Sequence, residues 1–207
     1  MPNSAVIIAN GRYPSHDIPL SVINNASYIV CCDGAANNFI AAGNIPNAIV
    51  GDLDSISDEN REKFADILHH VSEQENNDLT KAVNFCIERG INDITIVGGT
   101  GFREDHAIGN ISLLAEYVLK VNVRMITNWG IFSPINKDTT FNSFDGERVS
   151  IFAIDQVPLT STGLQYTIEN RILKNWWEGT LNVSVSNQFT IKTKGRVIVF
   201  QAFNTSK

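Results

Sequence analysis

The sequence has 207 residues, of which 43% are hydrophobic and 18% charged, and its formal net charge is −6. This length is enough for one large domain or two small ones, and the composition is that of a globular protein with a sizeable core. The acidic balance and the lack of a basic stripe argue against nucleic-acid binding, and no apolar run approaches the roughly 18 residues of a membrane span.

The cysteines and the N-terminus predict a cellular location. Cys31, Cys32 and Cys86 lack the paired spacing of a zinc site or a disulfide framework. Cys31 and Cys32 lie in an apolar run, so we expect core thiols in a reducing compartment. The segment 1–6 shows no signal-peptide pattern. We therefore expect a cytoplasmic protein with no membrane or nucleic-acid partner.

Short apolar strands alternate with helices over the first two thirds of the chain. Such strands predict a parallel sheet covered by helices on both faces. We thus predict an α/β fold with a Rossmann-like domain over residues 1–135. In order, the pattern predicts strand 5–9, helix 20–25, strand 28–32, helix 35–42, strand 48–50, helix 58–68, a weak strand at Val71, helix 78–89, strand 93–97, helix 105–119 and strand 121–127.

The pattern changes after Pro134, where short alternating segments replace the helices. We expect strands at 149–153, 180–185, 189–193 and 197–202. Turn signals such as Asp145-Gly146 and Lys194-Gly195 separate them. Residues 136–207 are therefore predicted to form a second domain, an antiparallel β-sandwich.

A pair of aspartates follows the third predicted strand. The run Ile49-Val50 enters Gly51, and Asp52 and Asp54 come next. On an extended strand, side chains at i and i+2 point to the same side, so the two carboxylates would project together. Two carboxylates that close repel each other unless a cation intervenes, and Mg²⁺ prefers oxygen ligands. The alternative is a loop of solvated acids that caps the next helix.

Other polar clusters follow neighbouring strands, and the carboxyl edge of a parallel sheet is where such folds bind ligands. Residues 33–37 combine Asp33 and Asn37 with small residues, which could be a phosphate site or a plain tight turn. Asp78 begins a helix with Lys81 one turn later, which could face a phosphate or only cap the helix. Asn128 follows the last strand of the series.

The segment 98–106 is the fourth cluster. Its glycines could cradle phosphates with their amides, and Arg103 suits a charge-dense phosphoryl group. It is not a Walker A loop, because no Gly-Lys-Ser/Thr follows. The alternative is a glycine turn with a solvated charge cluster, which we favour less because the other clusters share its edge.

Taken in order, these motifs resemble the thiamine pyrophosphokinase family. The resemblance rests on Gly51 to Ser55, on Asp78 with Lys81, and on Gly101 to His106 with Asn110. In the second domain, Gly163-Leu164-Gln165-Tyr166 and Ser186-Asn187 are similar to the family's Gly-Leu-Lys-Trp/Tyr and Ser-Asn segments. The resemblance covers essentially the whole chain. Glu75, Asn77 and Phe102 depart from the family pattern, where aspartate, threonine and glycine are usual.

The resemblance implies the transfer of diphosphate from ATP to the hydroxyl of thiamine with Mg²⁺, giving thiamine diphosphate and AMP. It implies Asp52, Asp54 and Asp78 as metal ligands, and Asp54, Asp78 and Arg103 as the catalytic set. It further implies a homodimer with active sites between subunits. The implied ATP-binding residues are Asp33, Asn37, Lys81, Arg103, Asp105, His106 and Asn128, and the implied thiamine-binding residues are Gly163, Leu164, Tyr166, Ser186 and Asn187.

Two other functions remain open from the residues alone. Asp-Leu-Asp-Ser after a strand also resembles the nucleophile motif of haloacid-dehalogenase phosphohydrolases. A non-catalytic nucleotide-binding module is the other alternative, although it would not need so many acids. We expect His16, His69 and His70 on the surface, and Trp176 and Trp177 in edge packing or an interface.

Overall fold

The computed structural model describes residues 2–204, and its contacts divide the chain into two compact units. Within the described residues, the first unit runs up to residue 113 and includes 120–128, and the second holds residues 114–119 and those from 129 onward. The strand β7 (Gly130–Ile135) thus groups with the second unit. No helix among residues 2–204 is both long enough and apolar enough to cross a membrane.

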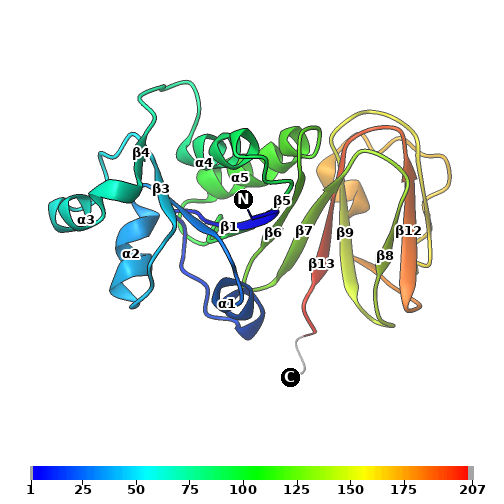
Figure 1. Cartoon of the computed structure of the whole chain (residues 1–207). Coiled ribbons are helices and arrows are strands. Elements are labelled where there is room, and N and C mark those ends of the chain that lie inside the picture. Colours follow the sequence, from blue (N-terminus) through cyan, green and yellow to red (C-terminus); the bar gives the residue numbers. More distant parts are fainter. Residues whose placement is uncertain (1, 205–207) are drawn as a thin grey trace. The chain divides into compact units, whose positions relative to one another are not determined.

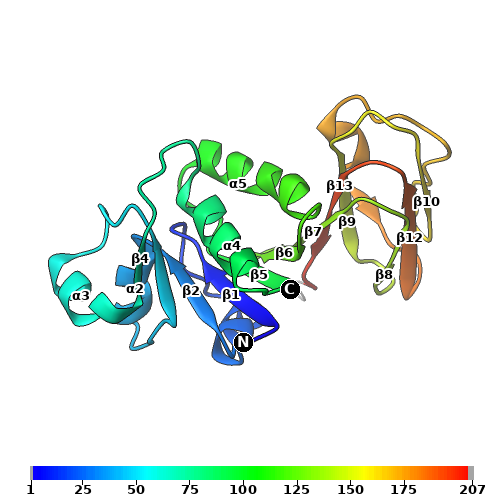
Figure 2. The same ribbon diagram turned by 45° about the horizontal axis from the view of Figure 1, so that its top comes forward.

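The first unit contains a parallel sheet, as the alternation of strands and helices predicts (Figure 2). Its strand order is β6-β5-β1-β2-β3-β4, and every neighbouring pair is parallel. The central strand positions are almost fully buried, which explains their continuous apolar sequence. The strands are β1 (Ser4–Ile8), β2 (Ile29–Cys32), β3 (Ala48–Gly51), β4 (Leu68–His70), β5 (Asp93–Val97) and β6 (Asn122–Ile126).

Helices cover this sheet on both faces. Figure 1 shows α4 and α5 on one face and α1 and α2 on the other. Apolar residues at helical spacing on α4, including Leu79, Val83 and Cys86, pack into the core. The helices are α1 (Asp17–Asn24), α2 (Ala35–Ala41), α3 (Asp58–Lys63), α4 (Asp78–Glu88) and α5 (Glu104–Tyr117), with a 3-10 turn η1 (Ala65–Ile67).

Three predictions of element position in the first unit are wrong. Helix α1 begins at Asp17 rather than Leu20, because the His16 Nδ1 accepts the Ile18 amide as an N-cap and Pro19 fits in a first helical turn. The predicted helix 58–68 ends at Lys63, and the weak strand expected at Val71 lies at β4 instead. His69 on this strand is half-buried, 4.6 Å from the Phe85 ring, and burial lowers its pKa.

The second unit is a sandwich of antiparallel strands, as predicted. One sheet contains β11-β9-β13-β7 and the other β10-β12-β8. Their buried residues, among them Ile151, Phe189 and Val199, form one core. The elements are β7, β8 (Thr139–Asn142), β9 (Arg148–Ala153), β10 (Leu159–Thr162), the 3-10 turn η2 (Trp176–Gly179), β11 (Asn182–Val183), β12 (Gln188–Thr193) and β13 (Val197–Ala202).

The sequence pattern does not predict three of these strands. Strands β7, β8 and β10 have short or weak alternation, and β7 contains Pro134. Proline disfavours a strand assignment because it cannot donate to the ladder. These strands form because β7 pairs with β13, and β8 and β10 pair with β12. Their own sequences do not predict this pairing.

Candidate functional site

The polar clusters of the first unit surround a cavity of about 490 Å³ at the carboxyl ends of its strands. The segment after β1 contributes Asn10 and Gly11, β2 contributes Cys32, and Asp52 follows β3. The other walls come from the start of α4 and from the glycine loop after β5. The remaining lining residues are Ala9, Gln74, Asn76, Asn77, Asp78, Leu79, Lys81, Gly99, Thr100, Phe102, Arg103, His106, Ala107 and Asn110.

Three carboxylates meet beside this cavity. Asp33, Asp52 and Asp54 each place an oxygen within 4.8 Å of those of the other two. The predicted pair of aspartates is therefore close in space, but not because the strand continues. Strand β3 ends at Gly51, and Leu53 adopts a left-handed conformation with φ of 64°. This turn, rather than strand alternation, brings Asp54 back toward Asp52.

Gly51 makes room for Asp33. A Cβ atom at position 51 would lie 2.6 Å from the Asp33 Cβ, so only glycine allows the two strand ends to approach this closely. Asp33 is fully buried, and its Oδ2 accepts the Ser55 amide at 3.0 Å. Burial raises the pKa of Asp33, and the nearby Asp78, Asp54 and Asp52 raise it further.

The second oxygen of Asp33 fits a metal ligand. Among the residues that the structure describes, Oδ1 of Asp33 is the one buried side-chain oxygen or nitrogen without a hydrogen-bond partner. A buried carboxylate oxygen with no donor is costly unless a proton or a cation meets it. Together with the oxygens of Asp52 and Asp54, it forms a donor set of the kind that Mg²⁺ prefers.

Lys81 joins the acidic cluster to helix α4. Its ammonium lies 3.2 Å from Asp78 Oδ1 and 3.8 Å from Asp52 Oδ2, and its side chain is only 3% exposed. Burial acts to raise the pKa of Asp52, but hydrogen bonds from Gln74 and the Asp54 amide and the charge of Lys81 bring it below its usual value. Asp78, predicted as the third metal ligand, pairs with Lys81 and is not among the three clustered carboxylates.

The loop after β5 forms the opposite wall. Gly98 has a φ of 70° and would place a Cβ 2.7 Å from the Ala9 carbonyl, so glycine is required for this turn. Arg103 donates to both carboxylate oxygens of Asp105, at 3.1 and 2.6 Å, and its side chain is 71% exposed. These bonds from Arg103 lower the pKa of Asp105 to about 2.

The other predicted ATP-binding residues divide into two groups. Lys81, Arg103 and His106 line the cavity, whereas Asn37, Asp105 and Asn128 do not. Asn37 instead braces the aspartate loop, with its amide bonded to the Ser55 carbonyl and the Ser57 amide. Asn128 Oδ1 accepts the backbone amides of residues 15 and 16.

The predicted thiamine-binding segments lie side by side in the second unit. Leu164 forms an antiparallel bridge with Ser184, and the Val185 amide donates to the Gly163 carbonyl at 3.0 Å. Tyr166 is 63% exposed, whereas Leu164 is 2% exposed and belongs to the core. Ser186 Oγ donates to the Gln188 carbonyl and the Asn187 carbonyl accepts the Ser143 amide. The Leu164 side chain therefore packs inside, and only its backbone can face a ligand.

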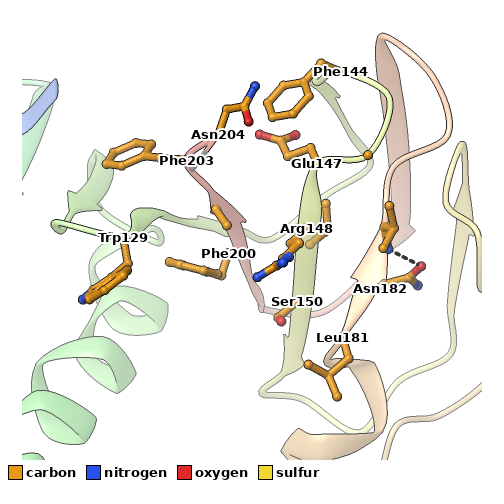
Figure 3. Close-up of a pocket in the computed structure, with 14 residues that line it drawn as sticks. Trp129, Phe144, Glu147, Arg148, Ser150, Leu181, Asn182, Phe200, Phe203 and Asn204 are labelled. Carbon is orange, nitrogen blue, oxygen red and sulfur yellow. Dashed lines mark hydrogen bonds between the residues drawn. The ribbon is translucent and has the colours of Figure 1, made fainter. Parts of the chain in front are cut away.

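Sequence reasoning missed a second cavity, of about 590 Å³, in the second unit. Figure 3 shows Phe144 and Glu147 at one end and Leu181 at the other, with Arg148 and Phe200 between them. None of the predicted thiamine-binding residues lines it. The sequence carries little signal for it because its residues come from β9, β11, β13 and the segments next to β7, β9, β11 and β13, which only the sheet order brings together.

The sequence analysis also does not predict that Asp33 lies beside Asp52 and Asp54. The resemblance implies Asp33 as an ATP-binding residue, and the structure places its carboxylate in the acidic cluster. The available signal was the position of Asp33 directly after β2, which pairs with β3, so that Asp33 and Asp52 end neighbouring strands.

Comparison with known families gives matches over most of the chain. Residues 20–127 match the model described as thiamin pyrophosphokinase, catalytic domain. Residues 130–200 match that described as thiamin pyrophosphokinase, substrate-binding domain. A thiamine pyrophosphokinase of Bacillus subtilis is 34% identical over 148 residues, covering 67% of this chain and 69% of that protein. A thiamin pyrophosphokinase of Caenorhabditis elegans is 28% identical over 201 residues, covering 81% and 73%.

Solved structures share the fold. The crystal structure of thiamine pyrophosphokinase from Bacillus subtilis superposes with a TM-score of 0.81 at 22% identity, covering 97% of this chain and 99% of that one. The enzyme from Candida albicans gives a TM-score of 0.79 at 19% identity, with coverage of 96% and 89%. The α/β unit and the β-sandwich unit described above are therefore both found in known structures.

Proposed function

Because the chain belongs to the thiamin pyrophosphokinase family, we propose that the acidic cluster and adjoining cavity of its first unit are the site of diphosphate transfer. The chain is an ATP-dependent diphosphotransferase that makes thiamine diphosphate and AMP from thiamine and ATP. The observation that carries the site assignment is the convergence of Asp33, Asp52 and Asp54 on one point beside the cavity.

We assign Mg²⁺ to this point, held by Asp33, Asp52 and Asp54. The unpartnered, buried Oδ1 of Asp33 supports the assignment. When bound there, the ion would neutralise charge on the phosphate oxygens. Lys81 holds Asp52 and Asp78 in place through its two ion pairs, which keeps Asp52 ionised and oriented toward the cluster. Asp78 as a direct ligand remains a prediction.

The remaining walls of the cavity would bind and orient the triphosphate of ATP. Phosphoryl-type transfer requires mainly positioning and charge neutralisation. Arg103 extends from the glycine loop and can offer a planar pair of donors to phosphate oxygens. Its Nε and Nη2 donate to Asp105, which orients the guanidinium, so the pair offered to phosphate would be that of Nη1 and Nη2. Asp54 is the proposed acceptor of the proton from the thiamine hydroxyl.

Thiamine is proposed to contact the second unit at Tyr166 and at the segment of Ser186 and Asn187. The exposed ring of Tyr166 suits stacking on a flat, cationic heterocycle. The domain match described as substrate-binding covers these residues.

The chain is further proposed to act as a homodimer with active sites between subunits. Large apolar side chains around the cavity of Figure 3 support this, since Trp129 is 72% and Leu181 85% exposed. Exposed apolar patches of this kind are typical of protein interfaces.

A cytoplasmic location also remains a proposal. It is supported by the three cysteines, which are buried free thiols rather than disulfides. Such thiols persist in a reducing compartment.

Product analysis tests the function directly. The purified chain is incubated with ATP, thiamine and Mg²⁺, and the products are separated by chromatography. We expect thiamine diphosphate and AMP in equal amounts. Inorganic phosphate released without thiamine would favour the phosphohydrolase alternative, and unchanged ATP would favour a nucleotide-binding module.

A further inference from the structure

Two asparagine side chains link the two walls of the nucleotide cavity. Asn77 caps helix α4, and its Oδ1 accepts the Thr80 amide at 2.9 Å. Its Nδ2 donates to Oδ1 of Asn110 on α5 at 3.2 Å. Asn110 in turn donates its Nδ2 to the Gly99 carbonyl at 2.9 Å. A continuous chain of hydrogen bonds thus runs from the first turn of α4 to the glycine loop.

The direction of this chain is fixed by its two ends. The Thr80 amide can only donate, so Asn77 must present its oxygen there and its NH₂ group to Asn110. The Gly99 carbonyl can only accept, so Asn110 must present its NH₂ group to the loop and its oxygen to Asn77. Rotating either amide by half a turn would set donor against donor or acceptor against acceptor. Both side chains therefore have one orientation that satisfies every group.

The chain of hydrogen bonds joins two elements that are both proposed to bind ATP. Helix α4 carries Asp78 and Lys81, whereas the loop carries the amides and Arg103 proposed to bind phosphates. Asn77, Gly99 and Asn110 all line the cavity between them. Resting on the proposed function, we propose that Asn77 and Asn110 are positioning residues that hold the glycine loop at a fixed distance from α4, and so set the ATP affinity of the site.

Asn77 is informative because one change separates its two roles. Serine is a good N-cap, so Asn77→Ser retains an acceptor for the Thr80 amide. Its side chain is shorter and carries no amide, so the bond to Asn110 is lost. Asn110→Ala removes both the bond to Asn77 and the bond to Gly99. The matched control is Asn122→Ser, which removes the hydrogen bond of 3.0 Å that Asn122 Nδ2 donates to Asp93 Oδ1, away from the cavity.

The test measures the KM for ATP, the KM for thiamine and the melting temperature of each variant. We expect Asn77→Ser and Asn110→Ala each to raise the KM for ATP about tenfold, as for a lost hydrogen bond in a positioned site. The KM for thiamine should stay within twofold of wild type in both variants. In Asn122→Ser, the KM for ATP and the KM for thiamine should both stay within twofold of wild type. A purely structural defect would lower the active fraction and the melting temperature, but it would not change the KM for ATP.

The double variant Asn77→Ser/Asn110→Ala distinguishes a chain of bonds from two separate ligand contacts. In a chain, Asn110→Ala already breaks the bond to Asn77, so the double variant should match Asn110→Ala. Multiplied effects, or a KM for ATP within twofold of wild type in either single variant, would overturn the proposal. Calorimetry of ATP with Mg²⁺ gives the same comparison without turnover, so failure of the proposed reaction and failure of this inference are separate results.

Discussion

Gly51 controls how closely the aspartates of the first unit can approach. A methyl group at this position would meet the Asp33 Cβ at 2.6 Å, and both atoms lie on strand ends that cannot easily move. We expect Gly51→Ala to lower the free energy of unfolding by about 1–3 kcal/mol, as overpacking does. It should also abolish measurable turnover, because Asp33 would be displaced from Asp52 and Asp54.

Gly109 provides the matched control for that change. It lies within helix α5, and an added Cβ would meet no atom within 4 Å. Gly109→Ala should therefore stabilise the chain by up to about 1 kcal/mol, because alanine is the better helix former. Chemical denaturation and initial rates measure both variants. Normal activity in Gly51→Ala would show that the close approach of Asp33 is unimportant.

Asp54 tests the charge of the acidic cluster without changing its shape. Asparagine is isosteric, and its oxygen can still accept the Ser55 hydroxyl, which lies 2.7 Å from Asp54 Oδ1. We expect Asp54→Asn to melt near the wild-type temperature but to lose roughly 100- to 1,000-fold in kcat at saturating Mg²⁺, as for loss of one charge-stabilising group. Turnover close to that of wild type would exclude Asp54 from the metal site.

At the scale of elements, the sequence predicts the first unit well and its turns poorly. The long apolar strands and α4 are evident from their periodicity. The end of β3 is not, because an extended strand and a turn both bring Asp52 and Asp54 together. Only the left-handed Leu53 distinguishes them, and leucine is an unusual residue for that conformation. The hydrogen bond between Asn77 and Asn110 is likewise not predictable from the sequence, since it joins residues 33 positions apart.

In the second unit, an ion pair joins the loop after β9 to the start of β13. Arg196 donates to both oxygens of Asp155, with Nη2 2.8 Å from Oδ1 and Nε 3.1 Å from Oδ2. These bonds lower the pKa of Asp155 below its value in an unfolded chain. The contribution to stability is therefore complete above about pH 5 and is lost as the pH falls through the lowered pKa.

Asp155→Asn should consequently reduce the free energy of unfolding by roughly 1 kcal/mol at pH 7, with a smaller difference from wild type near pH 3. Denaturation curves at both pH values provide the measurement. The control is Asp145→Asn in an exposed turn of the same unit. A difference that stayed constant or grew on acidification would contradict the assignment to this ion pair.

At the scale of the whole molecule, the proposed homodimer makes a prediction about mixed subunits. If Tyr166 of one subunit serves the acidic cluster of the other, an Asp54→Asn chain and a Tyr166→Ala chain should restore activity to each other when mixed. One site of the mixed dimer would then be wild type at both positions. Native mass spectrometry confirms the mixed dimer, and the test requires Tyr166→Ala alone to be severely impaired. Mixed dimers without recovered activity would show that each site is built within one chain.

Helix α5 belongs to both units, and this has a consequence for synthesis on the ribosome. Its end, within residues 114–119, groups with the second unit, where Glu116 pairs with Arg196. Residues 1–128 are synthesised well before Arg196, the ion-pair partner of Glu116. At roughly 5–20 residues per second, the 80 positions from Glu116 to Arg196 take several seconds to synthesise, and Glu116 has to wait that long for this partner. The end of α5 should thus gain this contact only late in synthesis, after the rest of the helix has been made.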